Sequence, residues 1–150
     1  MGLEWILGLP CADNVIALTT TTCRTLSRAD LNDPWCRQFL REALQRQVLV
    51  ASEWILNLGT RPALQRLAYF FLETLTRMDA LGMRDGSRYV LQLTQVELAD
   101  FLALTPVHIN RCLGTLRLRG VASFRGGRLT VHDLEKLRQH AHDNEGGWRV

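Results

Sequence analysis

Five arginines lie in one stretch of the chain that contains no acidic residue. Between Phe101 and His132 there is no Asp or Glu, although the whole chain is nearly balanced, with 18 Lys and Arg against 15 Asp and Glu. The arginines of this basic run are Arg111, Arg117, Arg119, Arg125 and Arg128. A guanidinium group presents a planar fork of donors that fits phosphate oxygens or the O6 and N7 atoms of guanine. The basic run therefore predicts a surface that binds duplex DNA.

Two short helices are expected to position the first of these arginines. Thr94 and Glu97 form a Thr-x-x-Glu capping box, so a helix is expected to begin at Gln95. Thr105 and Pro106 then provide a second start, with a capping hydroxyl and a proline in the first helical position. Two starts this close together predict a helix-turn-helix. On the capping evidence alone, a plain helical hairpin is the alternative.

The apolar spacing predicts which side of each helix is packed. In the second helix Ile109, Leu113 and Leu116 recur at helical spacing and are expected to face the core. The inward positions expected in the first helix are Val96, Leu98, Ala99 and Leu102. The positions expected on the outside of the second helix are Val107, His108, Asn110, Arg111 and Thr115. One side of the second helix therefore packs, and the other carries its polar and basic groups.

A short hairpin is expected directly after the second helix. Val121–Phe124 and Arg128–Val131 resemble strands, and Gly126-Gly127 between them can supply the positive φ angles of a tight turn. Arg125 and Arg128 flank this turn, where they are placed to contact the sugar-phosphate backbone beside a groove. This hairpin is interpreted as a wing, and the alternative is a solvated turn without a ligand.

The cysteines and histidines do not predict a metal centre. Cys11, Cys23, Cys36 and Cys112 are scattered without a C-x-x-C pair, so reduced thiols are expected rather than disulfides or a zinc site. His108 and Cys112 are four residues apart and could supply two ligands of a metal or redox switch, but no further ligands accompany them. With no nucleophile–base pair and no phosphate-binding glycine loop, we expect no metal, no cofactor and no enzymatic activity.

A long helix is expected upstream, from about Pro34 to Asn57. Two sets of its residues recur every seven positions, which gives a seam like that of a coiled coil with a polar break at Gln47. The seam and its flanks predict a dimer interface at Leu40, Leu44, Gln47, Val48, Ala51, Trp54, Ile55 and Leu58. An ordinary core helix is the alternative, because the seam lasts fewer than four heptads.

The other elements are expected to be short. Strands are expected at Val15–Leu18, at Thr22–Leu26 and at Tyr89–Leu93. Helices are expected from Arg61 to about Met78 and from about Asp133 to His140. The fold is therefore expected to be mainly α with a small β content.

Composition and charge predict a globular protein without a membrane segment. The 150 residues are 47% hydrophobic, no apolar run approaches the length of about 18 residues that a membrane helix needs, and the start lacks a basic signal-peptide region. We therefore expect a cytoplasmic protein. Residues 61–150 hold thirteen Lys and Arg against nine Asp and Glu, whereas residues 1–60 hold five against six. The positive surplus thus lies in the half with the helix-turn-helix.

The run LTQVELADFLALTPVHINRCLGTLRLRGV, residues 93–121, resembles the winged helix-turn-helix of the Crp/Fnr transcription regulators. More weakly, the resemblance extends over most of the chain, and it implies a recognition helix near residues 105–118. Expected base contacts, most of them implied by the resemblance, are Pro106, Val107, His108, Asn110 and Arg111. Expected DNA-backbone contacts are Thr94, Thr105, Thr115, Arg117, Arg125 and Arg128. Val107 replaces the acidic residue of the best-known members, which favours a thymine methyl over a cytosine amine as its partner.

The resemblance also implies how the chain is divided. Residues 1–32 are expected to be a remnant of a sensory β-roll, residues 33–58 a dimerisation helix, and residues 59–150 the winged helix-turn-helix domain. Most of the roll and its Gly-Glu cassette are missing, so no effector is expected. We expect a homodimer that binds a two-fold operator in double-stranded DNA, with RNA polymerase as a further candidate partner. The alternative is a truncated interaction subunit that forms a heterodimer with a full-length relative and modulates it.

Overall fold

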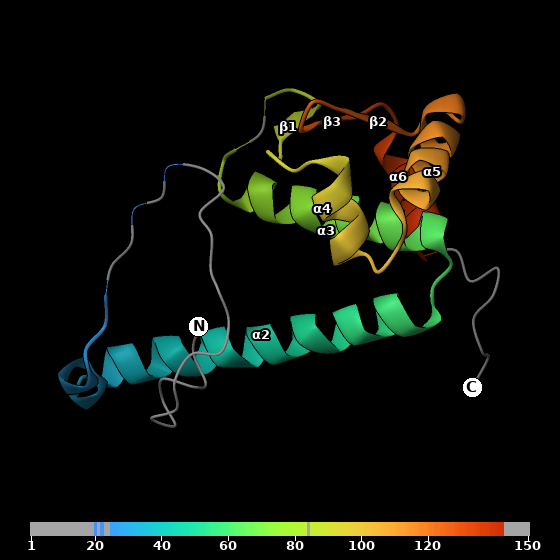
Figure 1. The fold of residues 1–150 in the computed structure, drawn as a ribbon. Helices are drawn as coiled ribbons and strands as arrows, with labels where there is room; N and C mark the ends of the chain where they lie inside the picture. Colours follow the sequence, from blue (N-terminus) through green and yellow to red (C-terminus); the bar gives the residue numbers. More distant parts are fainter. Residues whose placement is uncertain (1–19, 21, 23–24, 84, 143–150) are drawn as a thin grey trace. The chain divides into compact units, whose positions relative to one another are not determined.

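The computed structural model describes residues 20, 22, 25–83 and 85–142. The chain forms two compact units, residues 1–55 and 56–150. As expected, the fold is mostly helical with one small antiparallel sheet (Figure 1). The predicted strand Val15–Leu18 lies outside the described residues. Of the second predicted strand, Thr22, Thr25 and Leu26 are described and none of them is in a strand, so that prediction is wrong for these residues.

The first unit contains a short 3-10 helix, η1 (Arg28–Asn32), and most of the long helix α2 (Pro34–Thr60). Asp33 precedes α2, and its carboxylate accepts hydrogen bonds from the backbone N–H groups of Trp35 (3.4 Å) and Cys36 (3.2 Å). The helix runs three residues beyond the predicted end at Asn57. It stops at Thr60 because the next residue, Arg61, precedes a proline, and a residue before proline is disfavoured in helical conformation.

The second unit is built around α3 (Ala63–Ala80), which packs against α5 and α6. This helix begins two residues later than predicted because Pro62 occupies the capping position. Its buried side chains are those of Leu67, Ala68, Phe70, Phe71 and Leu75. The left-handed Gly82, with φ of 67°, follows the helix end, where glycine avoids the strain that other residues would carry.

The sheet has the order β1-β3-β2, with β1 (Arg88–Val90), β2 (Ala122–Arg125) and β3 (Arg128–Val131) all antiparallel to their neighbours. The strand predicted at Tyr89–Leu93 is shorter and begins one residue earlier. It ends early because Gln92 takes a left-handed φ of 51°, which turns the chain out of the sheet.

The remaining helices are α4 (Gln95–Phe101), α5 (Pro106–Leu118) and α6 (Leu134–His142). In α6 the side chains of Leu137 and Ala141 are buried, and the Asp133 carboxylate accepts a hydrogen bond from the Lys136 N–H at 2.9 Å. The predicted span, Asp133 to His140, is therefore shifted by one or two residues at each end. None of the helices in the described part of the chain is long and apolar enough to cross a membrane.

Candidate nucleic-acid interface

The start of α4 has the predicted capping box. The Thr94 hydroxyl accepts a hydrogen bond from the Glu97 N–H at 3.2 Å, and the Glu97 carboxylate accepts one from the Thr94 N–H at 2.7 Å. The same carboxylate accepts the Thr94 hydroxyl hydrogen at 2.8 Å. These bonds, first from the backbone and then from the hydroxyl of Thr94, lower the pKa of Glu97 below its ordinary value. The box fixes the first residue of α4 at Gln95, as predicted.

A tight turn connects α4 to α5. Leu102 ends α4, and Ala103 follows with a left-handed φ of 51°, which is uncommon for a residue with a Cβ. The Leu104 N–H donates to the Ala99 carbonyl at 2.9 Å, which closes the turn. The Thr105 hydroxyl then accepts a hydrogen bond from the N–H of residue 108 at 3.2 Å, and a proline occupies the first helical position. The structure thus confirms the predicted helix-turn-helix.

The packed sides of the two helices mostly match the prediction. Ile109, Leu113 and Leu116 of α5 are buried, and so are Leu98, Ala99 and Leu102 of the first helix. Cys112 is also buried, which was not predicted. Val96 was predicted to face inward but is 56% exposed. It is two residues from Leu98, which at about 100° per residue places it on nearly the opposite side of the helix.

The outward side of α5 carries the expected polar groups. Val107, His108, Asn110 and Arg111 are exposed, and Thr115 is half-buried. Every arginine of the basic run is exposed. The ion pairs found within the described residues join Glu73 to Arg77, Asp133 to Lys136 and Glu135 to Arg138. None of these ion pairs of the described residues contains an arginine of the basic run. The guanidinium groups of the run are therefore available to bind an external anion.

The wing hairpin forms, with β3 at the predicted residues and β2 one residue later than the predicted Val121–Phe124. Gly126 and Gly127 both have positive φ angles, 54° and 71°, as the two-residue hairpin turn requires. The Gly127 carbonyl accepts from the backbone N–H groups of Leu91 (2.8 Å) and Gln92 (3.2 Å), so the wing turn is attached to the chain that leads into α4. A Cβ at Gly127 would lie 3.2 Å from the Gln92 Cα, which leaves little room for a side chain.

The register of the hairpin places two arginines opposite each other. Arg125 pairs with Arg128 across β2 and β3, and both side chains are exposed. Like charges at directly opposed positions destabilise a hairpin unless a counter-charge compensates them. Arg88 on β1 pairs with Thr130, which is two residues from Arg128, so Arg88 lies on the same side of the sheet. The sequence did not single out Arg88, because its placement depends on the register.

A small pocket of about 170 Å³ joins α4, α5 and the wing. Its lining residues are Gln95, Asn110, Leu113, Gly114, Arg117, Phe124 and Arg125. Two arginines and two residues with side-chain amides thus line one hollow, and side chains of these types donate hydrogen bonds to the oxygens of phosphate groups. Three of the predicted DNA contacts, Asn110, Arg117 and Arg125, are brought together here, whereas Gln95 was missed.

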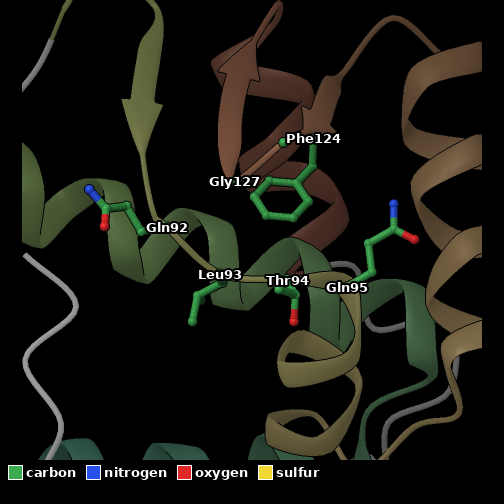
Figure 2. A pocket seen from close by; sticks show the side chains of 7 residues that line it. Gln92, Leu93, Thr94, Gln95, Phe124 and Gly127 are labelled. Carbon is green, nitrogen blue, oxygen red and sulfur yellow. The ribbon is translucent and has the colours of Figure 1, made fainter.

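A second, larger pocket of about 330 Å³ lies beside the wing turn. Figure 2 shows the Phe124 ring and Gly127 on one side and the chain from Gln92 to Gln95 on the other. Gln95 lines both pockets. No local sequence signal marks Gln95 as a site residue, because its place in both pockets depends on how α4, α5 and the wing come together.

Two predicted DNA-backbone contacts already use their hydroxyl groups within the protein. The Thr94 hydroxyl donates to Glu97, and the Thr115 hydroxyl donates to the Arg111 carbonyl at 3.0 Å. A phosphate would have to compete with these acceptors. Thr105 uses its oxygen as the helix cap instead.

The pair His108 and Cys112 does not form part of a larger ligand cluster among the described residues, where no group of three or more His, Cys, Asp or Glu side chains comes together. Cys112 is only 6% exposed, and burial raises the pKa of its thiol. A buried thiol with a raised pKa is a poor metal ligand, because metal binding requires the thiolate.

Comparison with known proteins identifies the helix-turn-helix. A family model described as a Crp-like helix-turn-helix domain matches residues 65–140. Transcriptional activator protein FnrL of Cereibacter sphaeroides is 31% identical over 118 residues, which are 76% of this chain and 48% of that protein. The anaerobic regulatory protein of Pasteurella multocida is 30% identical over 104 residues, 69% of this chain and 38% of that protein. The chain therefore spans about half the length, or less, of these relatives.

Solved structures share the fold. FixK2 from Bradyrhizobium japonicum superposes with a TM-score of 0.65 at 22% identity, covering 82% of this chain and 58% of that one. A CRP/FNR-family transcriptional regulator from Thermus thermophilus gives a TM-score of 0.60 at 20% identity, covering 74% and 56%. With the family model matching more than half of its residues, the chain belongs to the Crp/Fnr family of regulators and carries that family's helix-turn-helix domain.

Proposed function

We propose that this chain is a DNA-binding transcription regulator that places α5 in the major groove of duplex DNA. The observation that carries the proposal is the basic run. Its arginines are exposed on α5 and the wing, no acid interrupts them, and within the described residues no ion pair occupies them. A helix of this size fits the major groove, and free guanidinium groups beside it neutralise phosphates.

The residues at the start of α5 would contact the bases. Pro106, Val107, His108, Asn110 and Arg111 lie in its first two turns, and all of them are exposed. Arg111 is assigned to the O6 and N7 edge of guanine. Val107 is 62% exposed although it is apolar, which fits contact with a thymine methyl group. His108 and Asn110 would add base or phosphate contacts.

The DNA backbone would be held on both sides of α5. The assigned contacts are Thr94, Thr105, Thr115, Arg117, Arg125 and Arg128. The pocket shared by Arg117 and Arg125 is the proposed seat of one phosphate. A phosphate beside the wing would also offset the repulsion between Arg125 and Arg128, which face each other across the hairpin.

Two copies would act together through α2. The eight residues predicted for the dimer interface lie on one side of this helix at helical spacing, and four of them, Gln47, Val48, Ala51 and Ile55, are exposed in the single chain. Val48 and Ile55 are 54% and 72% exposed, although both are apolar. A symmetric pair would present two copies of α5 to a two-fold operator with half-sites about one helical turn apart.

In this proposal residues 33–58 form the dimerisation helix and residues 59–150 the DNA-binding domain, after a β-roll remnant at residues 1–32. The site of action is the cytoplasm, and RNA polymerase is a candidate partner on the promoter. Sedimentation of the purified chain tests the pairing. A monomer that assembles only when a full-length relative is added would favour the interaction-subunit alternative instead.

Substitutions of single arginines test the DNA contacts. Arg111→Ala should cost about 1–3 kcal/mol on a selected operator and flatten base preference, whereas Arg125→Ala should weaken all sequences alike and lower the salt slope by about one. Arg138→Ala is the matched control, because Arg138 pairs with Glu135 on α6, outside the basic run. Equal loss on selected and random DNA for Arg111→Ala would contradict the assignment of this residue to a base.

A further inference from the structure

Arg66 on α3 connects two segments that are far apart in the sequence. Its Nε donates to the backbone carbonyl of Arg61 at 2.8 Å, and its Nη1 donates to the carbonyl of Leu102 at 3.3 Å. The side chain is half-buried, and it takes part in none of the ion pairs found within the described residues. Arg66 therefore serves backbone carbonyls rather than a carboxylate.

One end of this bridge is the connection between α2 and α3. Arg61 lies between the two helices, its Nη1 donates to the Asn57 Oδ1 at 3.1 Å, and its guanidinium lies 4.2 Å from the centre of the Tyr69 ring. Asn57 is fully buried and is the one buried residue of α2. The conformation of Arg61 is thus set from the last turns of the long helix.

The other end of the bridge is the turn of the helix-turn-helix. Leu102 ends α4, and the carbonyls at a helix end have no partner within the helix. Directly after it comes Ala103 in its left-handed conformation, which redirects the chain into α5. A donor bound to the Leu102 carbonyl therefore restrains the turn at Ala103, and this turn sets the direction in which α5 leaves α4.

We propose that Arg66 is a positioning residue for the recognition helix, which ties the α2–α3 connection to the α4–α5 turn. The direction of α5 then depends on the conformation of residues 57–61, so a change at the end of the long helix reaches the DNA-contacting surface. The planar guanidinium of Arg66 donates to the carbonyls of Arg61 and Leu102 at the same time. A lysine has one ammonium group on a flexible side chain and cannot reach both carbonyls with the same geometry. That consequence for DNA rests on the proposed function, but the coupling itself does not.

Amide hydrogen exchange of the full chain without DNA tests the coupling. The reporters are the N–H of Ala103, which donates to the Asp100 carbonyl at 3.2 Å, and the N–H of Leu104, which donates to the Ala99 carbonyl. Arg66→Met and Arg66→Lys should both speed exchange at these amides about threefold to tenfold, as expected for the loss of one or two modest hydrogen bonds. Amides in the centre of α3 report any global loss of stability.

Gln65 provides a matched control. It neighbours Arg66, is also half-buried, and its Nε2 donates at 3.3 Å to the Ala141 carbonyl near the end of α6. Gln65→Met should speed exchange at the end of α6 and leave the amides of Ala103 and Leu104 unchanged. If Arg66→Lys exchanges like the unchanged protein, or if Gln65→Met accelerates the turn equally, the positioning role is overturned.

Asn57→Leu tests the far end of the path. The substitution keeps the size of the side chain and removes the acceptor for Arg61. It also removes a buried Nδ2 that has no hydrogen-bond partner among the described residues, so the fold should tolerate the change. Faster exchange at Ala103 and Leu104 is expected, and unchanged exchange there would overturn the proposed dependence on residues 57–61.

DNA binding provides the final readout. Arg66→Lys should lower the ratio of operator to random-sequence affinity about threefold to tenfold without changing the salt slope, since the charge is kept. Gln65→Met should leave the ratio unchanged. If the chain bound no duplex DNA, the proposed function would be refuted, and the hydrogen-exchange result would still decide whether Arg66 couples the two segments. If the chain bound DNA normally and Arg66→Lys left the affinity ratio unchanged, the role of Arg66 would be overturned.

Discussion

The helices α2 and α3 have similar apolar content but opposite surroundings. Five side chains of α3 are buried, and they form much of the core of the second unit. In α2, which is half as long again, the single buried side chain is the polar Asn57. Its exposed large apolar side chains are those of Trp35, Phe39, Val48, Leu49, Ile55 and Leu56. Since most helical stability in proteins comes from packing an apolar side, α3 obtains its packing within the second unit, whereas these apolar side chains of α2 find no such packing among the described residues.

The largest effect should come from placing charge on the proposed dimer side of α2. Val48→Glu combined with Ile55→Glu would force like charges into the symmetric interface and should weaken dimerisation by about 3–5 kcal/mol. Arg46→Glu is the control, because it changes the net charge by the same two units on the opposite side of the helix. Sedimentation equilibrium measures both variants. Equal dimer dissociation constants for the two would show that α2 is covered in some other way.

A leucine in each helix sharpens the comparison. Leu67 of α3 is fully buried, so Leu67→Ala should lower the free energy of unfolding by about 2–5 kcal/mol. Leu49 of α2 is 68% exposed, so Leu49→Ala should change it by no more than about 0.5 kcal/mol. Urea denaturation of each variant is the measurement. A large loss for Leu49→Ala would mean that this side of α2 is packed in solution.

Within the packed unit, Ala103 is one of two described residues other than glycine, with Gln92, that are held in the left-handed conformation. Ala103 has a φ of 51°, which is unfavourable for a residue with a Cβ and costless for glycine. Ala103→Gly should therefore stabilise the fold by about 0.5–1 kcal/mol, after allowing for the greater freedom of glycine in the unfolded chain. Ala99→Gly, in the buried part of α4, should destabilise it by about 1 kcal/mol. Thermal unfolding of the two variants measures both changes in stability. If both variants were destabilised, Ala103 would not be strained.

The smallest effect should appear at the helix starts on acidification. Hydrogen bonds from Thr94 lower the pKa of Glu97, so its contribution to stability is present above the ordinary glutamate pKa of 4.5 and is lost as the pH falls through the lowered value. Glu97→Gln should remove this pH dependence while keeping the cap, since glutamine also serves in a capping box. Exchange at the first amides of α4, followed from neutral to acidic pH, measures it. An identical acid response in both proteins would assign the titration to another group.

Local signals in the sequence were sufficient for the elements that carry the proposed site. A hydroxyl and a carboxylate three residues apart fixed the start of α4, a threonine and a proline fixed the start of α5, and two glycines fixed the wing turn. Each of these signals is an interaction or a backbone conformation of residues close together in the sequence. Its geometry can therefore be predicted from the residue types and their spacing. The exposed side of α5 followed from helical spacing for the same reason.

Tertiary structure decided what depends on distant residues. The prediction extended β1 to Leu93, but the attachment of the wing turn to Leu91 and Gln92 decided otherwise. The inward prediction for Val96 was an error of a different kind, because helical spacing from Leu98 already placed it outside. The prediction from sequence missed Gln95 and Arg88, whose places depend on a pocket between elements and on strand register. The sequence also contained no sign that Arg66 joins Arg61 to Leu102, because a hydrogen bond across 36 residues has no local pattern. Residue chemistry and helical or strand periodicity can be read from the sequence, whereas contacts between residues far apart in the sequence form only when the chain folds.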